Sequence, residues 1–110
     1  MLQITNAFSL SMLDPENVTS VAFIPISSTE AHHQVITSSE WKSLIGHADT
    51  ARIVGDLLHV VLPADRGSAR LADGEILVAQ YAGPRLPEGA TKLPAGATIK
   101  FFRVQQLNGE

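Results

Sequence analysis

A histidine that follows a glycine at the start of a helical pattern is the strongest candidate for chemistry in this sequence. An apolar run ends at Gly46, His47 follows, and apolar residues then recur at helical spacing through Leu58. A helix that begins here, capped by Asp49 or Thr50, has free N–H groups that form an anion site. Histidine can also donate or accept a proton near neutral pH. The segment therefore predicts either phosphate chemistry at His47 or a purely structural histidine.

Serine, arginine and glutamate side chains in three turn-rich stretches are further candidates for phosphate chemistry. Asn6 and Ser9 precede one or two helical turns, and Ser9 is either an N-cap or a phosphate-holding hydroxyl. Arg85 and Glu88 share a loop whose prolines favour preorganisation. The alternative for these two residues is a surface ion pair of little energetic value. Arg66 lies in a third turn, where we expect it to be partly exposed.

Metal and thiol chemistry are not expected from the residues present. His32 and His33 are neighbours, and neighbours on a helix diverge by about 100°, so they cannot chelate one ion as an i, i+4 pair does. We predict that both are solvated. The chain has no cysteine, which excludes disulfides, zinc fingers and a thiol nucleophile. Trp41 is predicted to lie in the hydrophobic core, and the alternative is that its ring stacks on a nucleic-acid base. We expect no metal and no cofactor.

The length and net charge of the chain limit its number of domains and the kinds of partner it can bind. A chain of 110 residues is predicted to form one domain, 1–110. The net charge of -3 argues against a partner such as long nucleic acid, which needs a broad basic surface, but permits a small anion held by a few arginines. No apolar run approaches the ~20 residues of a membrane span. The N-terminal residues have no signal-peptide pattern, so we expect a cytoplasmic protein.

Apolar residues recur along the chain both at helical spacing and in the alternating pattern of strands. Strands are predicted at 2–5, 18–24, 41–45, 75–81 and 99–104, and helices from about 28 to 35 and 49 to 58. The parsimonious fold is α/β: a mixed sheet of about five strands with packed α-helices. The strand at 75–81 contains an almost wholly apolar run, which predicts a central position in the sheet.

Several local details accompany this fold prediction. Asp73-Gly74, between strand-like runs, predicts a hairpin turn. Pro25 is predicted to end its strand, and Ser28 or Thr29 to cap the following helix. Gly46 is expected to permit a tight strand-to-helix turn.

Three segments together resemble the signatures of one family. They are Thr5-Asn6-Ala7-Phe8-Ser9-Leu10-Ser11-Met12-Leu13, Ile45-Gly46-His47-Ala48-Asp49-Thr50 and Arg85-Leu86-Pro87-Glu88-Gly89. In this order and at this spacing they resemble the viral type III anti-CRISPR ring nucleases, a family that also has cellular and prophage members. The resemblance extends over nearly the whole chain. It implies a homodimer that encloses cyclic tetra-adenylate across its two-fold axis and cuts it, without a metal, into linear di-adenylate with a 2′,3′-cyclic phosphate.

The resemblance also implies roles for individual residues. The implied catalytic residues are His47 as general acid, Glu88 as its acidic support, Arg85 and Ser9. The implied ligand-binding residues are Asn6, Ser9, Ser11, Gly46, Arg66 and Arg85. The sequence departs from the family at Ser11, where relatives often carry asparagine, and at Pro84 and Pro87. Residues 91–96 are too short and turn-rich for the helix that relatives commonly carry after Gly89.

Two alternatives to the nuclease remain. A sequestering protein would bind the cyclic messenger with the same arginines and Ser9 but leave it uncut. A structural or protein-interaction module would have lost the ligand, although the presence of Ser9, His47, Arg85 and Glu88 argues against that loss.

Overall fold

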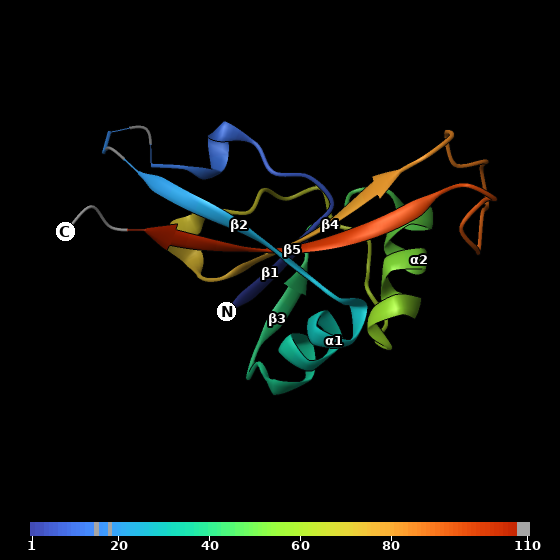
Figure 1. Ribbon diagram of the computed structural model, residues 1–110, viewed down its shortest axis with the longest axis horizontal. Helices are drawn as coiled ribbons and strands as arrows, with labels where there is room; N and C mark the ends of the chain where they lie inside the picture. The colour runs from blue at the N-terminus through green and yellow to red at the C-terminus, as the bar shows by residue number, and fades with distance from the viewer. Residues whose placement is uncertain (15, 18, 108–110) are drawn as a thin grey trace.

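Five strands form one mixed sheet in the computed structural model, which describes residues 1–14, 16–17 and 19–107 (Figure 1). The strands are β1 (Leu2–Thr5), β2 (Ser20–Ile26), β3 (Trp41–Ser43), β4 (Ile76–Ala82) and β5 (Thr98–Leu107). The helices are α1 (Ser28–Thr37) and α2 (Ala48–Leu58), with short 3-10 turns at Leu10–Met12 and Leu71–Asp73. The strand order is β2-β5-β4-β1-β3, so β4 is central as predicted. The α/β fold with about five strands is confirmed.

The direction of the strands brings the candidate segments to one edge of the sheet. β3 and β4 both pair with β1 in parallel, while β5 pairs antiparallel with β4 and β2. The carboxyl ends of parallel strands lie at the same edge, where loops commonly carry binding groups. The three segments that follow these strands are 6–9 after β1, 44–47 after β3 and 83–89 after β4. They contain the motifs singled out in the sequence.

Two apolar clusters lie on the two faces of the sheet. α1 and α2 cover one face, where Ile4 of β1 and Leu77 of β4 meet Val35 and Val54 of the helices. The opposite face is partly covered by the Leu10–Met12 turn and the chain before β4. Trp41 is half-buried and packs against the helix-side cluster, so it lies at the margin of the core rather than inside it as predicted. Among the described residues, no helix is long and apolar enough to cross a membrane.

The first helix begins with a capping box that the sequence prediction misplaced by one residue. Ser27 is the N-cap, its side chain accepts from the Glu30 N–H, and the Glu30 carboxylate accepts from the Ser27 N–H at 3.0 Å. These bonds, the backbone one foremost, hold the pKa of Glu30 below its ordinary value. Pro25 does not end β2, because β2 is an edge strand and an edge tolerates a missing N–H. The expected start at Val18 lies outside the described residues.

The predicted hairpin at Asp73-Gly74 is wrong. The residues before Gly74 form a 3-10 turn, and β4 begins beside β1 in parallel pairing, with Gln3 opposite Ile76. Gly74 has φ +139°, and a Cβ there would lie 2.1 Å from the Met1 carbonyl oxygen. The true hairpin joins β4 to β5 through the longer loop 83–97.

The expectation that both neighbouring histidines are solvated is only half correct. His33 is exposed, but His32 is half-buried where α1 packs against α2. Its Nδ1–H donates to the Leu58 carbonyl at 2.7 Å, because a carbonyl oxygen can only accept. The His32 ring also packs edge-on against His59, with ring centroids 5.0 Å apart. His32 therefore fastens the end of α2 to α1.

Candidate functional site

The structure brings His47 and Arg66 into one shallow hollow at the start of α2. The hollow has a volume of about 460 Å³ and is lined by Leu44, Gly46, His47, Arg66 and Gly67. His47 and Arg66 are both exposed, while Gly46 is half-buried. A proton donor and a fixed positive charge therefore share a surface that is open to a ligand. The two residues were predicted from separate stretches of the sequence.

Backbone contacts hold Arg66 against the turn that carries His47. The Asp65 N–H donates to the Ile45 carbonyl at 2.9 Å, and the Asp65 carboxylate accepts from the Gly67 N–H at 2.8 Å. A Cβ on Gly46 would lie 3.2 Å from Cγ of Arg66. Gly46 lies in the strand-to-helix turn, as predicted, and a Cβ there would be crowded, although the cause is the Arg66 side chain and not a positive φ. Because Gly46 has no Cβ, the Arg66 side chain can pack against it.

The second helix starts at His47 without a side-chain cap. His47 is the extended N-cap residue, with φ −103° and ψ 124°, and neither Asp49 nor Thr50 caps the helix. The first helical hydrogen bond runs from the Ala51 N–H to the His47 carbonyl at 3.0 Å. The N–H groups of the first turn consequently have no partner within the helix. They and the helix dipole favour an anion beside His47.

A buried carboxylate joins the Arg85–Gly89 segment to this helix end. Asp49 is 9% exposed, and its Oδ2 accepts from the Gly89 N–H at 2.8 Å across 40 residues of sequence. Gly89 has φ +78°, a conformation that favours glycine. Arg85 and Glu88 are both exposed on this segment. Residues 83–97 contain no helix, as expected from the turn-rich sequence after Gly89.

The segment after β1 does not contribute a residue to the lining of the His47 hollow. Ser9 precedes the 3-10 turn with an extended backbone and no capping bond from its side chain, so it is not a side-chain N-cap. Its hydroxyl oxygen lies 2.6 Å from that of Ser11, and both residues are exposed. Asn6 lines a different hollow of about 370 Å³. The other residues around that hollow are Ala7, Phe8, Phe23, Gln80 and Phe102.

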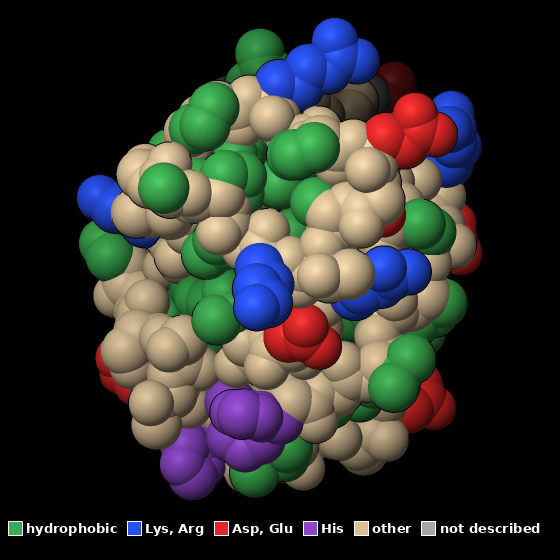
Figure 2. All heavy atoms as spheres, turned by 90° about the vertical axis from the view of Figure 1, so that its right-hand side faces the viewer, with side chains coloured by type: hydrophobic (Ala, Val, Ile, Leu, Met, Phe, Trp, Pro, Cys, Tyr) green, Lys and Arg blue, Asp and Glu red, His purple; other side chains and the backbone are tan. Residues whose placement is uncertain are grey.

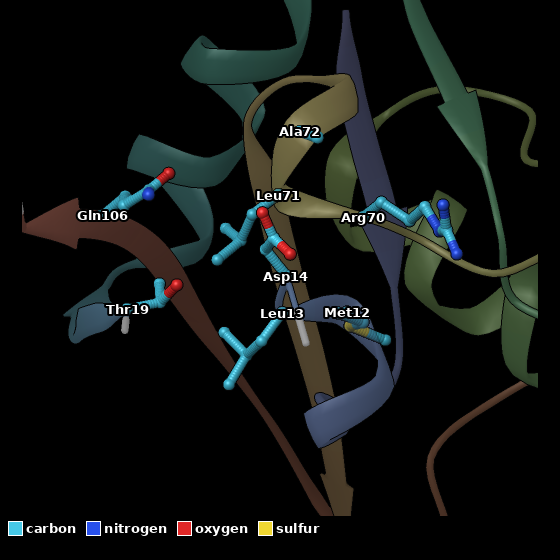
Figure 3. Close-up of a pocket in the computed structure, with 8 residues that line it drawn as sticks. All are labelled: Met12, Leu13, Asp14, Thr19, Arg70, Leu71, Ala72 and Gln106. Atoms are coloured by element: carbon cyan, nitrogen blue, oxygen red, sulfur yellow. The ribbon is translucent and has the colours of Figure 1, made fainter. Parts of the chain in front are cut away.

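A third hollow contains none of the predicted site residues. It has a volume of about 360 Å³, and Figure 3 shows the eight residues that line it. The carboxylate of Asp14 and the guanidinium of Arg70 point in different directions there. Hydrogen bonds from the Glu16 N–H and the Asn17 amide hold the pKa of Asp14 below its ordinary value. This hollow therefore presents both a carboxylate and a guanidinium, and the carboxylate opposes a phosphate ligand.

The surface beside α2 and the loop 83–97 has scattered charge. Figure 2 shows this end of the molecule, with separate Lys and Arg side chains, an acidic group between two of them, and histidines gathered at one border. The basic groups on this face form no broad single patch. Among the described residues, no group of three or more His, Cys, Asp or Glu side chains is placed to hold a metal ion.

Comparisons with known proteins match nearly the whole chain. The sequence model of the STIV B116-like family matches residues 2–96, a span that includes all three motifs. The solved structure of B116 of Sulfolobus turreted icosahedral virus (STIV) is 23% identical, with a TM-score of 0.75 over 94% of this chain and 97% of that chain. A search of curated proteins gives no significant match. The structural likeness shows the same fold, and the family match confirms the relationship expected from the motifs. The chain belongs to the STIV B116-like family.

Proposed function

We propose that the protein is a metal-independent ring nuclease that cuts cyclic tetra-adenylate into linear di-adenylate. The observation that carries this proposal is that a histidine, an arginine and the tether of a second arginine-bearing segment lie at one helix end. His47 and Arg66 line one hollow at the start of α2, and Asp49 joins the Arg85–Gly89 segment to the same helix end. Removal of this messenger would switch off type III CRISPR signalling, as an anti-CRISPR or as a host's own reset.

The proposed cleavage needs no nucleophile from the protein, because the ribose 2′-hydroxyl lies next to its own phosphate. The 2′-oxygen bonds to phosphorus in line with the leaving 5′-oxygen, and the hydroxyl proton passes to water. The bond between phosphorus and the 5′-oxygen breaks, which leaves a 2′,3′-cyclic phosphate. His47 gives its proton to the departing 5′-oxygen, and general acid catalysis of this kind contributes roughly 10²–10⁴-fold to the rate.

The remaining residues orient and neutralise the reacting phosphate. In this proposal the Glu88 carboxylate holds the orientation of the His47 imidazole. Arg85 and Arg66 offset the charge on the non-bridging oxygens, a task suited to the planar guanidinium. The Ser9 hydroxyl and the amides around it fix the ribose and phosphate in the in-line geometry.

We further propose that two copies of the chain enclose one ring. The hollow at His47 is shallow and smaller than four nucleotides, so a single copy leaves most of the ligand uncovered. A two-fold dimer presents every site residue twice. Arg66 and Arg85 then supply four cations for four phosphates, and two His47 side chains serve opposite bonds to give two di-adenylates. The second copy also contributes its own Ser9–Ser11 segment. In each copy, Asn6 and Gly46 are proposed to contact the ligand as well.

The decisive test is incubation of the purified protein with cyclic tetra-adenylate in EDTA, with the products resolved by chromatography. We expect linear di-adenylate that ends in a 2′,3′-cyclic phosphate. The variant His47→Ala should lose roughly 10²–10⁴-fold in cleavage rate and keep most of its affinity. His33→Ala is the matched control, because His33 is an exposed histidine on α1; it should cleave at the wild-type rate.

One result would contradict the nuclease, and a second would contradict the role of His47. Uncut ring that co-elutes with the wild-type protein would support the sequestering alternative, in which His47 only donates a hydrogen bond to phosphate. Equal losses of affinity and cleavage in His47→Ala would exclude His47 as the general acid. Sedimentation with and without the ring tests the dimer, which fails if the complex contains one chain.

A further inference from the structure

The loop 83–97 carries two proposed site residues, yet it has little secondary structure to hold it. Its base is fixed, because Ala82 and Thr98 pair across β4 and β5, and a Cβ on Gly83 would lie 2.7 Å from Ala97. Beyond this base, the Ala90 N–H donates to the Pro87 carbonyl and the Ala97 N–H to the Pro94 carbonyl. These hydrogen bonds are local, so they do not fix where the loop lies relative to the hollow.

One contact does fix it. The Gly89 N–H donates to Oδ2 of Asp49 at 2.8 Å, and within the described residues it is the hydrogen bond that ties the loop beyond its base to another element; the bond from the Tyr81 hydroxyl to the Pro84 carbonyl lies at the base itself. Asp49 is 9% exposed and belongs to the first turn of α2, two residues after His47. A carboxylate with so little exposure is stabilised there by the N–H donor and by the helix dipole. Glu88 is the immediate neighbour of the tethered residue.

We propose that Asp49 is a positioning residue that holds the loop 83–97 against the start of α2. By holding Gly89, Asp49 also positions Glu88, the preceding residue, and Arg85, which lies three residues before Glu88. The carboxylate does not touch the ring; it acts by limiting the freedom of the segment that does. The tether stands on the geometry alone, while its consequence for cleavage rests on the proposed function.

Hydrogen exchange tests the tether without any ligand. Asp49→Ala should speed exchange of the Gly89 amide about 10-fold or more, because a charge-assisted hydrogen bond is lost. Asp49→Asn should keep slow exchange, since an amide oxygen also accepts from an N–H. Asp56→Ala is the matched control, because it removes an exposed carboxylate from the same helix without a loop contact. Unchanged Gly89 exchange in Asp49→Ala would overturn the tether.

Kinetics with cyclic tetra-adenylate test what the tether does. Asp49→Ala should lower kcat/KM about 10- to 100-fold, because a misplaced catalytic loop costs that much, while Asp49→Asn should restore most of it. A merely structural role would lower the melting temperature equally in Asp49→Ala and Asp49→Asn and leave kcat/KM of the folded fraction unchanged, which would overturn the positioning role. If the wild-type protein neither binds nor cuts the ring, the proposed function fails, and the exchange result still decides the tether.

Discussion

Two arginine-bearing loops meet the same helix end, and they are held there in opposite ways. The Arg66 loop, residues 59–70, is built into the fold by its backbone, through the Asp65–Ile45 hydrogen bond and close contact with Gly46. The Arg85 loop is long and is attached beyond its base by one carboxylate, that of Asp49. Both loops present an exposed guanidinium.

This difference indicates that the two arginines are positioned by different means. A group fixed by backbone contacts is placed as soon as the chain folds, so the Arg66 position needs no further residue to maintain it. A group on a long loop pays an entropic cost when a ligand orders it, and a tether reduces that cost in advance. The position of Arg66 is therefore set by the fold itself, whereas we expect the position of Arg85 to depend on Asp49.

The largest effect that distinguishes the two loops is expected from a double-mutant cycle. In an uncleaving His47→Ala background, Arg66→Ala and Arg85→Ala should each weaken binding of cyclic tetra-adenylate about 10- to 100-fold, as expected for hydrogen bonds to charged groups. Adding Asp49→Ala should be additive with Arg66→Ala. It should add much less to Arg85→Ala, because the tether acts through that loop.

Calorimetric titration measures all of these affinities. Asp56→Ala again serves as the carboxylate control, and it should be additive with both arginine variants. Equal coupling of Asp49 to Arg66 and to Arg85 would show that the carboxylate acts on the whole site electrostatically, and the comparison between the loops would fail.

A second, smaller contrast concerns stability and compares Gly67→Ala with Gly89→Ala. A Cβ on Gly67 would lie 2.9 Å from Cδ2 of the buried Leu44 and 3.1 Å from Oδ1 of Asp65. We expect this crowding to lower the free energy of unfolding by roughly 1–3 kcal/mol. A Cβ on Gly89 meets nothing within 4 Å, so only its φ of +78° opposes alanine.

Thermal melts of the two variants check this contrast. Each kcal/mol lost should lower the midpoint by about 4 °C or more in a domain of this size, so Gly67→Ala should melt clearly below Gly89→Ala. The reverse order would mean that the loop 83–97 contributes more to the folded core than its contacts indicate.

The sequence was sufficient to predict the sheet and the candidate motifs, because both depend on local pattern. The apolar run in β4 predicted its central place, and the glycine before His47 marked the start of α2 within one residue. Apart from the N-cap of α1, which was misplaced by one residue, what failed depends on contacts between distant segments. Gly74 looked like a hairpin glycine, but its conformation serves the approach of β1 to β4, and that pairing joins residues more than 70 apart.

The same limit applies to the site. Asp49 was interpreted as a cap, since an acidic residue at a helix start commonly accepts from its own first turn. Its actual donor, the Gly89 N–H, lies 40 residues away and has no local signature. The positions of His47 and Arg66 in one hollow likewise depend on the Asp65–Ile45 contact. Motifs therefore identified the candidate residues, and only the fold identified the contacts that hold their segments together.

The smallest expected effect comes from Tyr81→Phe, at the base of the long loop. The Tyr81 hydroxyl donates to the Pro84 carbonyl, directly before Arg85. Because this bond is exposed, water replaces it at a cost below about 0.5 kcal/mol, less than a typical buried hydrogen bond. We expect affinity for cyclic tetra-adenylate to fall less than about threefold, far less than in Asp49→Ala when both are measured by the same titration. If Tyr81→Phe instead weakened binding as strongly as Asp49→Ala, the loop would be positioned from its base, and Asp49 would not be the contact that places Arg85.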